Sequence, residues 1–324
     1  MYEKWKGVHT RCVFNMIQEL IPLTRPRTLA AALGPTILGA AFSYYAFGAA
    51  QGTGLAIFHT VLIFLAVVTA QIVANLWNEY KDFKSGLDAG QKVGNAGSIT
   101  RGVITPELII TMIKALMFVP IIIGLYLSAT ITWYYIPVGF LCILISFLYS
   151  GGPKPISRTP FGEISSGIAM GFAIVLITGY AWIRELSLAL LIPAIPSTLL
   201  VGSIMLTNNI RDIRNDESHG RHTLPIVLGR ERALSLMSIS YIFNFIWIIA
   251  WIIVGHMTWF ALLAFLAAPL AFKTIHTLST NTDEFQLDKA MGTTAGAAMI
   301  YQLMSNASLD DLKKADLEMN ILIL

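Results

Sequence analysis

Two short segments of this 324-residue chain carry carboxylates and amides at the spacing of a helix. The first reads AQIVANLWNEYKDFKSGLD and ends a long apolar stretch. Side chains three and four residues apart lie on the same face of a helix, so this segment predicts one polar stripe. The stripe consists of Asn75, Asn78, Glu79 and Asp82. Gly86 is expected to end the helix and to let Asp88 fold back towards the stripe.

A second segment, MLTNNIRDIRNDESHG, places Asn208, Asp212 and Asp216 at intervals of four residues. It also ends an apolar stretch, so two helices are expected to bring carboxylates and amides to the same depth in a membrane. Such oxygen ligands suit Mg²⁺, which binds through one or two carboxylates together with substrate phosphates. Carboxylates near lipid are costly to desolvate, and a divalent cation with a diphosphate would offset that cost. The alternative is salt bridging to the interspersed basic residues Lys81, Lys84, Arg211 and Arg214.

Further basic residues follow each polar stripe and are candidates for neutralising a diphosphate. They stand in the segments GSITRGVITP, YSGGPKPISRTPFGE and HGRHTLP, as Arg101, Lys154, Arg158 and Arg221. Arginine binds phosphate groups through a fixed bidentate fork, which favours this interpretation. The general excess of Lys and Arg in cytoplasmic loops explains their presence equally well.

The composition indicates a membrane protein. Charged residues make up 13% of the chain and hydrophobic residues 55%, with a mean hydropathy of +0.66. A soluble domain carries about 25% charged residues, so this chain has too little polar surface to cover itself in water. The net charge of +3 is too small to imply a nucleic-acid partner. The two cysteines, Cys12 and Cys142, indicate neither a disulfide framework nor a zinc site.

Apolar segments near the length of a membrane-spanning helix, about 20 residues, recur along the chain. They predict an all-α polytopic membrane protein with about nine transmembrane helices around one central cavity. The predicted spans are 28–48, 55–78, 108–131, 133–150, 162–183, 186–209, 233–255, 257–275 and 288–307. Because no long polar linker interrupts them, residues 28–308 are expected to form one domain. A cytoplasmic segment, 1–27, precedes it, and a tail too short and too charged to span, 309–324, follows it.

Lys and Arg are distributed unevenly between the predicted connections. They are frequent before the first span and after the second, fourth and sixth spans, whereas the connections on the other side hold only Arg184. Cytoplasmic loops of membrane proteins carry the excess of Lys and Arg. The N-terminus and the three basic loops are therefore predicted to face the cytoplasm, and the polar stripes to lie at the cytoplasmic ends of their helices.

These residues resemble the UbiA-type membrane prenyltransferase superfamily, whose members have nine transmembrane helices and two Asp-rich motifs. Asn78-x₃-Asp82 followed by Asp88 is similar to the first motif, and Asp212-x₃-Asp216 is similar to the second. Within the superfamily, five ordered stretches resemble most the branch that prenylates 1,4-dihydroxy-2-naphthoate in menaquinone synthesis. They are LTRPRTL, NLWNEYKDFKSGLD, RGVITPE, YSGGPKPISRTPFGE and NNIRDIRNDESHGRHTLPIVLGRERA.

The resemblance implies a Mg²⁺-dependent enzyme of the bacterial cytoplasmic membrane. It would join a polyprenyl diphosphate to 1,4-dihydroxy-2-naphthoate, release diphosphate and CO₂, and give demethylmenaquinol. The implied catalytic residues are Asp82, Asp212 and Asp216. The implied metal ligands are Asn78, Asp82, Asp88, Asp212 and Asp216, together with Glu79, which stands where many relatives have Asp. The implied substrate-binding residues are Asn75, Arg101, Tyr149, Lys154, Arg158 and Asn208.

Two other functions are compatible with parts of the sequence. One is a sister prenyltransferase that acts on 4-hydroxybenzoate or haem. The other is an ion-coupled secondary transporter, in which carboxylates inside the membrane coordinate ions near its midplane. Here the carboxylates stand at the ends of their apolar stretches, and no pair of broken helices marks a midplane site, so the enzyme is the favoured interpretation.

Overall fold

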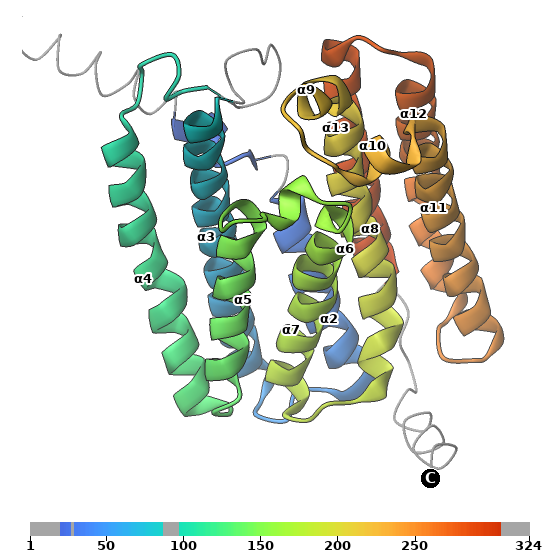
Figure 1. The fold of residues 1–324 in the computed structure, drawn as a ribbon. Coiled ribbons are helices and arrows are strands. Elements are labelled where there is room, and N and C mark those ends of the chain that lie inside the picture. The colour runs from blue at the N-terminus through green and yellow to red at the C-terminus, as the bar shows by residue number, and fades with distance from the viewer. Residues whose placement is uncertain (1–19, 27–28, 87–96, 306–324) are drawn as a thin grey trace, which may run out of the picture.

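The computed structural model describes residues 20–26, 29–86 and 97–305, and all regular structure in these ranges is helical (Figure 1). Most of the predicted cytoplasmic segment 1–27 and the whole tail 309–324 lie outside the described residues. The predicted all-α fold is confirmed.

The helices of the first part of the chain stand roughly parallel to one another (Figure 1). They are α2 (Ala30–Phe47), α3 (Thr53–Ser85), α4 (Pro106–Thr130) and α5 (Tyr135–Ser150). A short turn, η3 (Ile156–Arg158), then leads into one continuous helical segment. That segment consists of α6 (Gly162–Ser166), the π-helical turn η4 (Gly167–Phe172) and α7 (Ala173–Ile183).

The second part of the chain adds helices on the other side of the bundle. They begin with η5 (Leu188–Leu190) and α8 (Leu191–Arg211) and continue with α11 (Arg230–Ile253), η6 (Trp259–Ala267), α12 (Ala268–Thr280) and α13 (Glu284–Met304). Two short helices, α9 (Ile213–Ser218) and α10 (Leu224–Leu228), lie beside the end of α8 (Figure 1). Asp212 stands at the end of α8, and Asp216 lies in α9. The second acidic motif is therefore divided between these two helices.

Six of the described helical segments are long and apolar enough to cross a membrane. They are Thr53–Ser85, Pro106–Thr130, Gly162–Ile183, Leu188–Arg211, Arg230–Ile253 and Trp259–Thr280. Helices α2, α5 and α13 lie at the three other predicted positions, and α5 is apolar but shorter. The polytopic membrane fold is therefore confirmed, while the count of nine spans stays a prediction.

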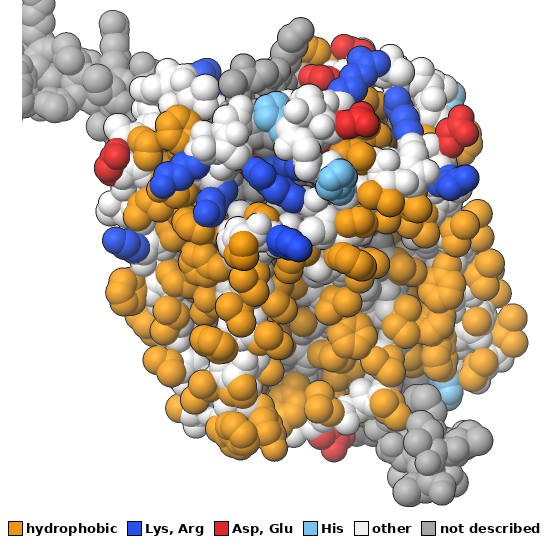
Figure 2. Space-filling view, viewed as in Figure 1, with side chains coloured by type: hydrophobic (Ala, Val, Ile, Leu, Met, Phe, Trp, Pro, Cys, Tyr) orange, Lys and Arg blue, Asp and Glu red, His pale blue; other side chains and the backbone are white. Residues whose placement is uncertain are grey.

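Large apolar side chains cover the flanks of the bundle, and charged side chains gather at one end of it (Figure 2). Phe118 on α4, Phe140 on α5 and Ile253 on α11 are 63%, 67% and 79% exposed. A water-facing surface this apolar would be strongly unfavourable, whereas lipid solvates it at no such cost. The distribution explains why the chain can form helices that are apolar on nearly every side.

Helix α3 continues beyond its apolar segment. The predicted span stops at residue 78, but the helix runs to Ser85 and ends at Gly86, which adopts the left-handed conformation with φ 74° and ψ 6°. This conformation is the usual one for a glycine that ends a helix, so the prediction for Gly86 is confirmed. As a result, the whole first polar stripe lies on the last turns of one regular helix.

The π-helical turn η4 packs against α8 with almost no side chain between the two backbones. A methyl group added at Gly167 would lie 2.6 Å from the carbonyl oxygen of Thr198. One added at Gly171 would lie 2.6 Å from the carbonyl oxygen of Ser197. Small residues allow this close approach, which is a common way to hold membrane helices together by van der Waals contact. The packing fixes α7 and α8, two walls of the cavity described below, relative to each other.

We expect Gly171→Ala to lower the thermal unfolding midpoint of the detergent-solubilised protein, because such overpacking costs about 1–3 kcal/mol. Gly124→Ala is the matched control, since a methyl group there would meet nothing within 4 Å and alanine favours a helix. Gly124→Ala should leave the midpoint unchanged or raise it slightly. Equal midpoints for the two variants would contradict the tight contact between η4 and α8.

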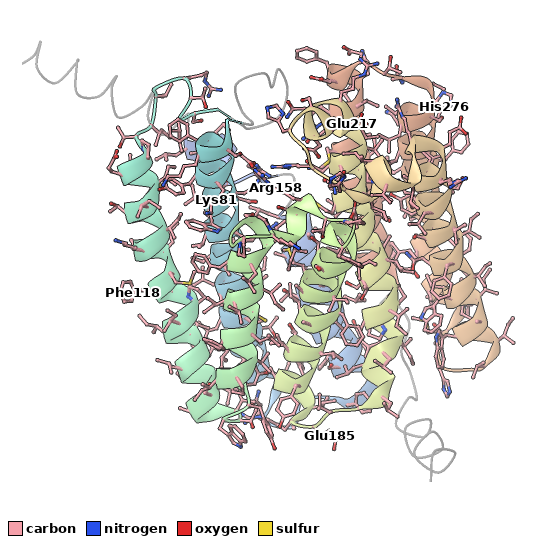
Figure 3. All side chains as sticks on the ribbon, in the orientation of Figure 1. Lys81, Phe118, Arg158, Glu185, Glu217 and His276 are labelled. Carbon is pink, nitrogen blue, oxygen red and sulfur yellow. The ribbon has the colours of Figure 1, made fainter. Side chains whose placement is uncertain are left out.

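The charge distribution also predicts the topology of the protein. Glu217 lies at the charged end of the bundle and Glu185 at the opposite end, and both are exposed (Figure 3). In a variant without Cys12 and Cys142, a cysteine at position 185 should react with an impermeant thiol reagent added to intact cells. A cysteine at position 217 should react only after the cells are opened, because basic loops face the cytoplasm. The reverse pattern of labelling would invert the topology.

Candidate active site

A cavity of about 240 Å³ lies at the centre of the bundle, as predicted. Protein interiors hold few voids larger than a water molecule, so a space of this size indicates a ligand site. Helices α2, α3, α5, α7, α8 and α13 and the turn η4 all contribute to its wall. The apolar part of the wall consists mainly of Ala31, Val67, Ala70, Ala74, Cys142, Ile145, Ala169, Met170, Ile174, Ile177, Val201, Ile204, Met205 and Met291.

The amides of both sequence segments line this cavity. Asn75 and Asn78 come from α3, and Asn208 comes from α8. Neighbouring groups orient the first two: Asn75 Nδ2 donates to the carbonyl oxygen of Thr24 at 3.1 Å, and Asn78 Oδ1 accepts from Ser150 Oγ at 3.1 Å. On both helices the amides lie nearer the charged end than the apolar lining residues do. The cavity therefore has a polar end and an apolar body.

One guanidinium group joins the two acidic motifs at the polar end. Arg221 Nη2 lies 2.6 Å from Asp82 Oδ1, and Arg221 Nη1 lies 3.2 Å from Asp216 Oδ1. Asp82 belongs to α3 and Asp216 to α9, and both residues are buried. The two motifs, more than a hundred residues apart in the chain, therefore lie within the span of one arginine side chain.

The third aspartate is held by a different arginine. Arg211 contacts both carboxylate oxygens of Asp212, with Nε to Oδ1 and Nη2 to Oδ2 each 2.7 Å. The same guanidinium donates to Asp288 Oδ1 at 2.8 Å and to Asn208 Oδ1 at 2.9 Å. The alternative interpretation of the acidic stripes as salt-bridging residues thus holds for Asp212 and Arg211.

The two lysines of the first segment lie over aromatic rings. Lys81 Nζ is 4.9 Å from the centroid of the Trp77 ring, and Lys84 Nζ is 5.1 Å from that of Tyr80. Each pair is a cation–π contact on the surface of α3. The carboxylate of Asp82 is consequently paired across the site with Arg221 and not with these neighbours on its own helix.

Glu79 has a partner of another kind. Its side chain is buried, and Oε1 accepts hydrogen bonds from the backbone N–H groups of Gly97 and Ser98 at 2.9 and 3.0 Å. Arg101 follows in the same loop and donates from Nη2 to Ser98 Oγ at 3.3 Å. Glu79 therefore attaches this loop to α3, and its role as a metal ligand stays a prediction. Asp88 lies outside the described residues.

The remaining predicted residues come from α5 and the loop that follows it. Tyr149 lines the cavity and hydrogen-bonds with Ser166. The backbone oxygen of Arg158 accepts from the N–H of His222 at 2.9 Å, and its side chain lies within electrostatic range of Asp82 (Figure 3). Lys154 is exposed. Tyr149 and Arg158 thus lie at the site, whereas the side chain of Lys154 lies at the surface of the protein.

The oxygen ligands at this end fit a divalent cation. Burial raises the pKa of the Asp216 carboxyl to about 7, Arg221 opposes the rise, and Asp212 and Asp82 add to it. Such mutual repulsion of buried carboxylates is what a bound cation relieves. No group of three His, Cys, Asp or Glu side chains forms a complete metal site within the described ranges. Mg²⁺ does not require one, because it keeps several waters and takes further ligands from substrate phosphates.

Sequence reasoning overlooked three residues at the site. Arg25 lines the cavity, has a positive φ of 51°, and lies within electrostatic range of Asp82. A positive φ is uncommon for a residue other than glycine and often marks a functional position. Asn209 also lines the cavity and donates from Nδ2 to Glu163 Oε1 at 2.8 Å. Glu163 is 4% exposed. The signals available in the sequence were the basic residue before Pro26 and the paired amides at 208 and 209.

The sequence is similar to that of known prenyltransferases. The model of the UbiA prenyltransferase family matches residues 32–301. The 1,4-dihydroxy-2-naphthoate octaprenyltransferase of Bacillus subtilis (strain 168) is 36% identical over 288 residues, which cover 87% of this chain and 88% of that protein. The protein of the same name in Escherichia coli (strain K12) is 27% identical over 292 residues, covering 86% and 91%.

Solved structures share the fold. The apo structure of a UbiA homolog from Aeropyrum pernix K1 superposes with a TM-score of 0.63 at 18% identity, covering 90% of this chain and 98% of that one. The UbiA homolog from Archaeoglobus fulgidus bound to DMAPP and Mg²⁺ gives a TM-score of 0.57 at 18% identity, covering 89% and 99%. With a family model that matches most of its length, and with two acidic motifs joined by an arginine that lines the cavity, the chain belongs to the UbiA prenyltransferase family.

Proposed function

We propose that this protein transfers a polyprenyl group from a polyprenyl diphosphate to 1,4-dihydroxy-2-naphthoate, with release of diphosphate and CO₂ and formation of demethylmenaquinol. The observation that carries the proposal is the near full-length similarity to bacterial proteins that bear the name of this reaction. We further propose that the protein lies in a bacterial cytoplasmic membrane, with its N-terminus and the loops of the site on the cytoplasmic side.

The shape of the cavity suits a donor with one charged and one apolar end. On α3 the lining residues extend from Asn78 to Val67, about 16 Å at 1.5 Å per residue. The diphosphate would lie at the amide end beside Arg221, and the first isoprene units would lie along the apolar body. Side chains such as Ile145 and Ile174 line this part and would exclude water from the reacting carbon.

Mg²⁺ is the cofactor that the site is proposed to use. Asp82, Asp212 and Asp216 would hold it, with Asn78, Glu79 and Asp88 as further proposed ligands. When bound, the metal would supply Lewis-acid stabilisation of the charge on the diphosphate leaving group. Of these proposed ligands, Asp82 and Asp216 are paired with Arg221 and Asp212 is paired with Arg211, which supports a site where cations balance these carboxylates.

The chain's own cations would act on the leaving group. As the allylic C1–O bond breaks, its electron pair would leave with the diphosphate, and Arg25, Arg221 and Arg158, which lie near the cavity or Asp82, would stabilise that negative charge. Arg101 and Lys154 are further proposed contacts. The carbon C1 gains carbocation character, which the surrounding apolar wall protects from water.

The acceptor would then form the new carbon–carbon bond. Ionisation of a ring hydroxyl raises the electron density of the carbon that bears the carboxylate, and this carbon attacks C1. The carboxylate next leaves as CO₂, and the electron pair of the broken bond restores the aromatic ring and returns the negative charge to the ring oxygen, which takes back the proton lost at ionisation to give demethylmenaquinol. Tyr149, Asn75 and Asn208 line the cavity and are proposed to orient the two substrates. A cation in the loop after α5, Lys154 or Arg158, is proposed to hold the carboxylate until that step.

We expect Asp82→Asn and Asp212→Asn each to lower turnover by about 10²-fold or more, because each removes a negatively charged ligand of the proposed metal, which would stabilise the leaving group, and hardly changes the volume. Prenyl transfer by purified protein in detergent, measured at limiting Mg²⁺, is the test. Glu217→Gln is the control, since this carboxylate is exposed on α9. Near-normal turnover by either aspartate variant would contradict a metal site built from both motifs.

Release of CO₂ should accompany transfer to the naphthoate. With the carboxylate carbon labelled, labelled CO₂ is expected to form in step with diphosphate, because loss of the carboxylate restores the aromatic ring. The same assay with a panel of aromatic acceptors that includes 4-hydroxybenzoate measures the acceptor specificity. Efficient prenylation of 4-hydroxybenzoate with no turnover of the naphthoate would reject the proposed acceptor and leave the family assignment intact.

A further inference from the structure

Arg221 occupies an unusual position, between the two acidic motifs and in the wall of the cavity. Its guanidinium contacts Asp82 at 2.6 Å and Asp216 at 3.2 Å, and the side chain is 12% exposed. Its Nε atom is buried and has no hydrogen-bond partner among the described residues. The guanidinium thus balances two buried carboxylates and keeps one donor uncommitted.

The backbone around Arg221 holds the residue in place but leaves the side chain to span the site. The N–H of Arg221 donates to the carbonyl oxygen of Asp216 at 3.0 Å, which closes the turn after α9. Gly220 in this turn has a φ of 68°, a conformation that favours glycine. The side chain of Arg221 therefore extends from the turn after α9 across the site to Asp82 on α3.

Arg211 provides a contrast within the same site. It donates to Asp212, Asp288 and Asn208, and it does not line the cavity. Its contacts connect α8 with α13 and are those of a structural salt-bridge network. Of these two arginines, Arg221 alone joins the two motifs and faces the space proposed for the diphosphate.

We propose that Arg221 is the resident counter-ion of the site: it pairs with both acidic motifs in the donor-free protein and turns to the diphosphate when metal and donor bind. This inference rests on the proposed function. A guanidinium fork binds carboxylate and phosphate oxygens with similar geometry, so the exchange keeps its donors paired. The carboxylates released by Arg221 become available to the divalent cation.

The exchange has a thermodynamic consequence. While Arg221 holds Asp82 and Asp216, a metal ion alone must displace it and leave a buried guanidinium unpaired, which is costly. A diphosphate that arrives with the metal gives the guanidinium a new partner. Metal and diphosphate should therefore bind cooperatively, and by linkage each strengthens the binding of the other by the same factor.

The test measures binding of Mn²⁺ to the purified full-length protein in detergent by electron paramagnetic resonance, with and without inorganic pyrophosphate. Arg221→Gln should bind Mn²⁺ alone about tenfold more tightly than the unmodified protein, because one charge-assisted competitor is gone. With pyrophosphate present the order should reverse. Arg214→Gln is the matched control: it removes one positive charge from an exposed position on α9 and should leave both affinities within about twofold.

Arg221→Lys is a second variant that keeps the positive charge, so the test does not depend on whether Arg221→Gln folds. An ammonium group cannot reach two carboxylates through a fork, so this variant should lie between the other two in its affinity for Mn²⁺ alone. Thermal midpoints should also show a larger stabilisation by Mn²⁺ in Arg221→Gln than in the unmodified protein. Equal Mn²⁺ affinities in all variants, or weaker binding of Mn²⁺ alone by Arg221→Gln, would overturn the inference. Failure of every protein to bind Mn²⁺ even with pyrophosphate would instead reject the metal-dependent function itself.

Discussion

Burial of carboxylates at one end of an apolar helical bundle is the constraint on which the rest of this structure depends. Asp82 and Asp216 are 8% and 2% exposed, at a depth where an unpaired charge is strongly unfavourable. Arg221 and Arg211 compensate the acidic motifs in the protein alone. The same buried oxygen groups are the proposed ligands of a divalent cation, so one set of side chains would serve both the stability of the fold and the proposed binding of a charged substrate.

The helical scaffold keeps this charged end connected to an apolar cavity. The first motif lies on α3, and the second begins at the end of α8 and continues in α9. On α3 and α8 the same face that ends in amides begins with apolar side chains that line the cavity. The close contact of Gly167 and Gly171 with α8 fixes the wall between α7 and α8. A donor with a diphosphate head and an isoprenoid tail requires this sequence of environments, because its head needs cations and its tail needs a dry surface.

Periodicity within single helices was sufficient to predict much of the protein. Apolar segments near the length of a membrane span predicted the all-α polytopic fold, and the three- and four-residue spacing predicted that Asn75 and Asn78 share one polar face of their helix. In the structure both amides line the cavity. Gly86 ends α3 as expected, since a glycine readily adopts the left-handed conformation there. These features depend on residues close in sequence, and local geometry determines them.

The partners of the charged groups were decided only by the tertiary structure. Spacing alone allowed Asp82 to pair with Lys81 or Lys84, yet its partner is Arg221, from the turn after α9. Glu79 shares a stripe with Asp82 but binds the backbone of residues 97 and 98. Sequence period determines the face of a helix on which a side chain lies. The rotation of that helix against its neighbours, and the path of the loops, determine what the side chain meets, and both result from packing between residues far apart in the chain.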